Sequence, residues 1–140
     1  MRVLAVTLVA LTVAACAILG GGGAPDPLAG WAGVWSGSYY GSMGDAGPLE
    51  LEFSTDTAGL PAGLARFDTG MGPTQAPLEA LALTADSVRA MIYFEGMSAE
   101  IAGTRTEDKA EGSYVVRPEG QDEVVDSGSW EIARQPGAGG

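Results

Sequence analysis

Apolar and polar residues alternate along much of the chain between residues 31 and 134. In the clearest case, Leu49, Leu51 and Phe53 fall on one face of an extended segment, and two glutamates fall on the other. This period-two alternation predicts a half-buried β-strand whose glutamates lie in solvent.

Further short segments of this kind follow one another along the chain, separated by Gly, Pro and Asp residues typical of turns. Such turn signals every 8–12 residues or so favour an all-β sandwich or a closed antiparallel barrel. Residues 78–83 are alanine-rich and also fit a helical turn, and residues 68–73 are predicted to be a longer loop. Eight strands are predicted in one domain, at residues 33–40, 49–53, 60–68, 78–83, 88–94, 99–104, 112–117 and 127–134.

The first residues have the pattern of an export signal. Met1-Arg2 is followed by an apolar run from Val3 to Leu19, and Val13-Ala14-Ala15 stands directly before Cys16. Residues 13–16 resemble the bacterial lipobox, which implies a signal peptide over residues 1–15 and a lipid attached to Cys16. The protein is therefore expected to be a lipoprotein of the cell envelope, in the outer membrane if the host has one. Two alternatives remain open: ordinary secretory cleavage that releases a secreted protein, and an uncleaved run that spans the bilayer.

Both ends of the domain are flanked by residues that pack poorly. Residues 16–30 include four consecutive glycines and two prolines, and are predicted to be a flexible linker between the lipid anchor and the domain. Residues 135–140 are predicted to be a disordered tail.

The charge and the missing residue types narrow the function further. The net charge is −11 and every acidic residue follows Cys16, so phosphate backbones are repelled and nucleic acid is not an expected partner. The chain has no histidine and a single cysteine, which removes the commonest general base and any intramolecular disulfide. We expect a monomer that folds without metal or cofactor.

No group of residues predicts catalysis. Glu50 and Glu52 share the outer face of one strand and are expected to be solvated rather than to form an acid–base pair. Asp122, Glu123 and Asp126 lie in one loop but lack the ordered spacing of a calcium site. The protein is therefore not expected to be an enzyme.

Some apolar residues have two interpretations. Met71, Met91, Tyr93, Phe94 and Met97 fit either ordinary core packing or the adaptable wall of a ligand pocket. The three tryptophans are predicted to be structural rather than to stack on a ligand.

The first and last strands carry a family resemblance. Gly33-Val34-Trp35 and residues 127–134 resemble the calycin pattern of lipocalins and their relatives, and the Gly-x-Trp and Gly-Ser-Tyr motifs are similar to a small β-barrel module of bacterial envelope proteins. The resemblance implies a meander barrel of roughly eight strands over residues 31–134. It also implies that Trp35 lies across the closed end of the barrel and that Arg134 packs on it.

Two functions are compatible with such a barrel. It is either a binding module that holds a small apolar or amphipathic ligand in its lumen, or a filled barrel whose acidic surface contacts a basic envelope protein, for example as an inhibitor. The free volume of the lumen discriminates between them.

Overall fold

The structure, a computed structural model, describes residues 27–136. The predicted signal peptide, Cys16 and most of the predicted linker lie outside the described residues, as do residues 137–140. One 3₁₀ turn, η2 (Pro27–Gly30), precedes nine strands: β1 (Gly33–Gly41), β2 (Ala46–Thr55), β3 (Pro61–Asp68), β4 (Pro73–Pro77), β5 (Glu79–Leu83), β6 (Ser87–Phe94), β7 (Met97–Thr106), β8 (Lys109–Pro118) and β9 (Asp126–Arg134). Among these residues no helix has the length and apolar character needed to cross a membrane.

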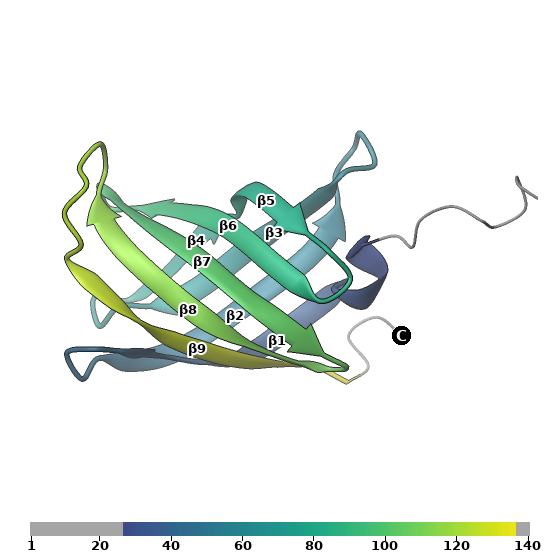
Figure 1. The fold of residues 1–140 in the computed structure, drawn as a ribbon, viewed down its shortest axis with the longest axis horizontal. Helices are drawn as coiled ribbons and strands as arrows, with labels where there is room; N and C mark the ends of the chain where they lie inside the picture. Colours follow the sequence, from purple (N-terminus) through teal and green to yellow (C-terminus); the bar gives the residue numbers. More distant parts are fainter. Residues whose placement is uncertain (1–26, 137–140) are drawn as a thin grey trace, which may run out of the picture.

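The strands form one antiparallel sheet that curls into a nearly closed barrel (Figure 1). Their order is β4-β3-β2-β1-β9-β8-β7-β6-β5, so β1 pairs with β2 on one side and with β9 on the other. Between the end strands β4 and β5, Leu78 N–H donates a hydrogen bond to the carbonyl of Gly63 of β3 at 2.8 Å, which continues the β3–β4 ladder. The two ends of the sheet approach each other where β4 lies against β6 and β3 lies against β5. The predicted all-β meander barrel is confirmed, and it is consistent with a calycin-like fold.

One strand was not predicted. β4 lies within a segment whose prolines, Pro73 and Pro77, are typical of a loop. Both stand at the ends of an edge strand, where proline is tolerated because its missing N–H does not cost a hydrogen bond of the ladder. Residues 79–83, which also fitted a helical turn, form strand β5. The ladder of β5 with β6 is irregular between Glu79 and Ala82.

The alternation in β2 is confirmed. Leu49, Leu51 and Phe53 are buried inside the barrel. Glu50 and Glu52 lie outside, and both accept hydrogen bonds from Arg66 of β3, at 2.5 and 2.9 Å. Partly exposed ion pairs of this kind contribute little to stability, so the buried side chains carry the packing of this strand.

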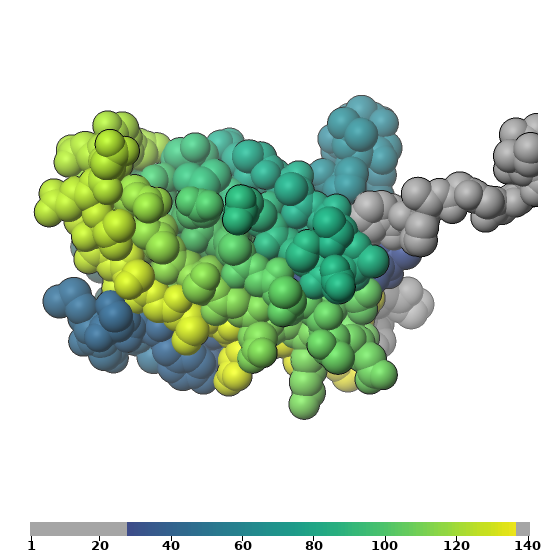
Figure 2. Space-filling model, in the orientation of Figure 1, coloured from purple at the N-terminus to yellow at the C-terminus, as the bar shows by residue number. Residues whose placement is uncertain are grey.

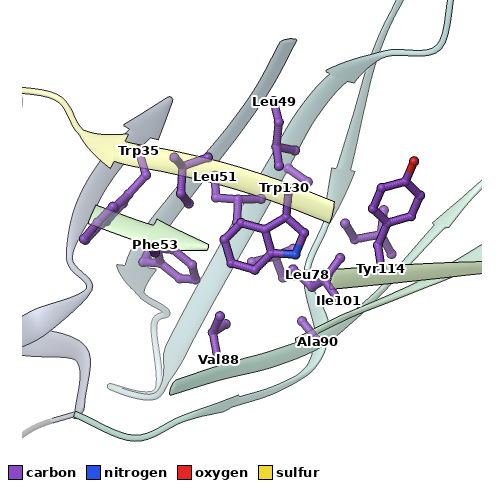
Figure 3. Packing of buried hydrophobic residues seen from close by; sticks show 14 of the residues in the cluster. Trp35, Leu49, Leu51, Phe53, Leu78, Val88, Ala90, Ile101, Tyr114 and Trp130 are labelled. Carbon is purple, nitrogen blue, oxygen red and sulfur yellow. The ribbon is translucent and has the colours of Figure 1, made fainter. Parts of the chain in front are cut away.

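Trp130 divides the interior of the barrel into two halves (Figure 3). Its indole lies against the backbone of Gly103 and Gly112, and a Cβ at Gly112 would stand only 2.6 Å from Trp130 Cζ2. Its N–H donates to the carbonyl of Ser113 at 3.0 Å. Glycine at these two inward positions makes room for the largest side chain of the barrel's middle layer.

The ordered domain extends beyond the predicted boundaries. Residues 27–30, the last part of the predicted linker, form η2, which buries Leu28 against the barrel. After β9, Gln135 N–H donates to the carbonyl of Val34, at 2.8 Å, so the predicted tail begins with a residue that is bound to β1.

Candidate functional site

One end of the barrel is closed by Trp35 and Arg134. These residues are direct neighbours in the β1–β9 ladder, and the Arg134 guanidinium lies 4.7 Å from the centroid of the Trp35 ring. Arg134 also donates hydrogen bonds to the carbonyls of Ala32, at 2.8 Å, and Gly30. Its Nε lies 3.1 Å from Asp108 Oδ1 without hydrogen-bond geometry, so this contact is an ion pair only. The structure thus brings together the two residues that the calycin resemblance pairs.

Trp31 completes the closure of this end. Its ring centroid lies 5.5 Å from that of Trp35 and 5.4 Å from that of Phe53. The indole N–H donates to the carbonyl of Thr84 at 2.9 Å, and the Arg105 guanidinium lies 5.9 Å from the ring. The sequence contained no signal that pairs Arg105 with Trp31. With every tryptophan buried and its N–H bonded to protein, this half of the barrel is filled.

The opposite end holds an open cavity of about 320 Å³. Its walls are mostly inward-facing apolar and aromatic side chains, and its rim is formed by the β1–β2, β3–β4, β6–β7 and β8–β9 connections. Figure 2 shows two of them projecting at the left end, the blue β1–β2 loop below and the yellow-green β8–β9 loop above. The lining residues are Tyr39, Asp45, Leu49, Phe67, Thr69, Met71, Ile92, Phe94, Glu95, Met97, Ala99, Ile101, Tyr114, Val116, Val125, Asp126 and Trp130.

Aromatic pairs shape the cavity. Trp130 lies between it and the filled half, with Tyr114 on the cavity side (Figure 3). The rings of Tyr39 and Tyr114 meet edge to face at 6.0 Å. Phe67 of β3 and Phe94 of β6 meet edge to face at 5.0 Å, although their strands are not hydrogen-bonded to each other. This second pair therefore bridges the two ends of the sheet near the mouth.

Two larger depressions, of about 520 and 430 Å³, lie on the outer wall over β1, β7, β8 and β9. Their lining is mixed, because polar side chains such as Thr104, Glu111 and Glu131 contribute about as much of it as apolar groups do. Volume alone therefore does not identify the site, and the mouth cavity is the better candidate because it combines apolar walls with a few polar groups.

Some of the methionines and aromatic residues that the sequence offered as pocket candidates line the cavity. Met71, Phe94 and Met97 line the cavity. Met91 and Tyr93 alternate with the buried residues of β6 and face outward. Tyr39 and Tyr114 were not predicted as pocket residues. Tyr39 could have been, because it is four residues after Trp35 on the same strand and therefore faces inward as Trp35 does.

The cavity has a negative electrostatic environment. Burial raises the pKa of Tyr39 above its ordinary value, and the charges of Asp45, Asp68 and Asp126 raise it further. Burial likewise raises the pKa of Tyr114, together with Asp126 and Asp45. Tyr39 donates to the carbonyl of Asp68 at 2.5 Å, and Tyr114 donates to Asp126 Oδ2 at 3.4 Å. Negative charge beside each phenol disfavours ionisation of the ring.

Metal-ligating side chains do not converge anywhere within residues 27–136. The loop acids Asp122, Glu123 and Asp126 therefore do not form a metal-binding cluster in the described part of the chain. No protein-family model matches the chain, and no curated protein is significantly similar to it.

Proposed function

We propose that this protein is a non-catalytic binding protein that holds one small apolar or amphipathic molecule in the mouth of its barrel. The observation that carries the proposal is the cavity of about 320 Å³ between Trp130 and the rim, with its apolar walls. Small-molecule sites typically measure about 300–1,000 Å³, so this cavity fits a small ligand.

The division of the barrel supports the same function. The filled half, around Trp31 and Trp35, buries the largest side chains of the domain. The other half leaves space where Ala99, a small residue, faces inward between Ile92 and Val116 on the neighbouring strands. One half thus provides stability, and the other is free to accept a ligand without a rearrangement of the core.

The proposal includes attachment of the protein to the cell envelope through a lipid on Cys16. The described chain enters the barrel through η2, which lies at the filled end (Figure 1). An anchor on the N-terminal side of η2 would leave the mouth at the opposite end of the barrel unobstructed.

Filling the cavity tests the proposal. The probe is 1-aminoanthracene, a small aromatic amine whose emission rises in apolar surroundings. We expect saturable binding at one site on the wild type and at least tenfold weaker binding to Ala99→Leu, whose added carbons occupy the cavity. Ala102→Leu is the matched control, because Ala102 lies on the same strand and faces outward.

The two variants also define the outcome that contradicts the proposal. Circular dichroism first establishes that both remain β-rich. Absence of saturable binding to the wild type, or equal loss in the two variants, would show that the probe does not occupy the mouth.

An interaction module remains the alternative, and the exposed apolar residues of the rim favour it. Met43, Met71 and Val124 are all largely exposed at the mouth end. A protein partner would cover this rim, so Met43→Ser combined with Val124→Ser would weaken partner binding and leave the probe affinity unchanged. If a ligand is instead held deep in the cavity, Ala99→Leu weakens binding of the probe and leaves binding of the partner unchanged.

A further inference from the structure

Three carboxylates line the mouth of the cavity: Asp45 from the β1–β2 loop, Glu95 from the β6–β7 turn and Asp126 from the start of β9. Two of them lie near the hydroxyl of Tyr114. Tyr114 Oη is 3.4 Å from Asp126 Oδ2. A Cβ at Gly41 would be 3.0 Å from Tyr114 Oη and 3.2 Å from Asp45 Oδ2, so this phenol and the Asp45 carboxylate approach the same point.

No cation of the described chain neutralises these carboxylates. The structure gives Asp45, Glu95 and Asp126 no ion-pair partner within residues 27–136, and no Lys or Arg side chain lines the cavity. The arginines that do form ion pairs or hydrogen bonds are engaged elsewhere: Arg66 and Arg117 on the outer wall, and Arg105 and Arg134 at the filled end.

Tyr114 adds a polar group directly beside these carboxylates. Its side chain reaches into the cavity and the residue is 8% exposed. Its hydroxyl donates to Asp126 and accepts no hydrogen bond from the described residues. The phenol oxygen lies beside the backbone of Gly41 and Gly128 and next to Asp126, and no described donor uses its acceptor lone pair. The rings of Tyr39, Tyr114 and Trp130 also line this space, and aromatic faces attract a cation within about 6 Å.

We infer that the ligand of the mouth cavity is a cationic amphiphile, an ammonium group carried on a small apolar body. The apolar body occupies the space above Trp130, and the ammonium lies at the rim between Asp45 and Asp126, beside Tyr114. Attraction of a cation is stronger beside Asp126 than in open solvent, because Asp126 is partly buried and the effective dielectric constant is lower there, whereas Asp45 and Glu95 are exposed. This inference rests on the proposed function and specifies its ligand class.

An isosteric ligand series tests it. The full chain, held in nanodiscs of zwitterionic lipid, is titrated calorimetrically with benzyltrimethylammonium, with its uncharged carbon isostere neopentylbenzene, and with the anion phenylacetate. Empty nanodiscs are the blank. We expect the cation to bind at least tenfold more tightly than the isostere, and the anion to show no measurable binding.

Charge-removing variants locate the effect. Asp45→Asn combined with Asp126→Asn should weaken benzyltrimethylammonium binding about tenfold and leave neopentylbenzene binding unchanged. Glu79→Gln combined with Glu111→Gln removes the same charge from the outside of the barrel and should change neither. If the Asp45/Asp126 variant fails to fold, the wild type still provides a test, because raising the salt concentration should weaken binding of the cation and not of the isostere.

Each outcome has a defined consequence. Equal binding of all three compounds would overturn the cationic ligand class and leave the proposed cavity function standing. Binding of none would overturn the cavity function itself. Equal losses in the two double variants would overturn the assignment to Asp45 and Asp126, because net charge alone would then explain the preference.

Discussion

The guanidinium of Arg134 lies over the indole of Trp35 and joins the last strand of the barrel to the first. The same guanidinium donates to the carbonyls of Ala32 and Gly30, so it also holds the segment that leads into β1. One side chain thus stabilises both the strand closure and the filled end.

This relationship predicts coupled losses of stability. Trp35→Ala should cost about 3–5 kcal/mol, as expected for truncation of a buried aromatic residue. Arg134→Ala should remove about 0.5–2 kcal/mol of ring contact and leave two carbonyls without their donor. The double variant should lose less than the sum of the two, by about 0.5–3 kcal/mol. Urea unfolding measures all three values.

Arg89→Ala is the control for this cycle. Arg89 lies on the outer face of β6, and its removal should change the unfolding free energy by less than about 0.5 kcal/mol. Strictly additive losses for Trp35 and Arg134 would show that the contact does not contribute to closure.

The position of Trp130 predicts intolerance of side chains at Gly112. Gly112→Ala places a Cβ against the carbonyl oxygen of Ala102 and 2.6 Å from Trp130 Cζ2, and should destabilise the fold by about 1–3 kcal/mol, the usual range for overpacking. Ser113→Ala, one residue further and on the other face of β8, should have little effect. Thermal unfolding of the two variants compares them directly, and equal melting temperatures would contradict this view of the core.

The raised pKa of Tyr114 predicts a loss of stability in alkali. In the unfolded chain the phenol ionises near pH 10 or so, whereas burial, Asp126 and Asp45 keep it protonated to higher pH in the fold. This contribution is therefore fully present below about pH 10 and is lost as the pH rises toward the folded pKa. Tyr114→Phe should show a shallower decline of unfolding free energy above about pH 10. An identical slope in wild type and variant would contradict the shift.

The lipobox-like residues before Cys16 predict a covalent lipid. Metabolic labelling with a fatty-acid probe should mark the wild type, and Cys16→Ser should remain unmarked, because the thiol is the atom modified. Equal labelling of both proteins, or of neither, would contradict lipid attachment and favour secretion or an uncleaved anchor.

Much of the barrel could be predicted because its signals are local. Leu49, Leu51 and Phe53 specify an inward face by alternation alone, and the pairing of Trp35 with Arg134 followed from a resemblance. β4 could not be predicted because Pro73 and Pro77 are tolerated only at a sheet edge, and the edge is a property of the whole sheet.

For related reasons, the sequence could not show that Leu28 belongs to the domain and could not choose between a filled barrel and a cavity. Leu28 lies among residues typical of a linker, and its burial depends on the barrel end that it covers. The cavity depends on the summed volumes of residues from many strands, such as Ala99 on β7 and Phe67 on β3. The pattern of residues within one strand does not indicate the volume that side chains from many strands leave free.

The most direct test of a ligand site in the mouth follows the three tryptophan indole N–H signals by NMR as benzyltrimethylammonium is added to ¹⁵N-tryptophan-labelled protein. Trp130 borders the cavity, whereas Trp31 and Trp35 lie in the filled half. We expect the Trp130 signal to shift saturably and the other two to stay in place. Three unmoved signals, or equal shifts of all three, would contradict a ligand site in the mouth of this barrel.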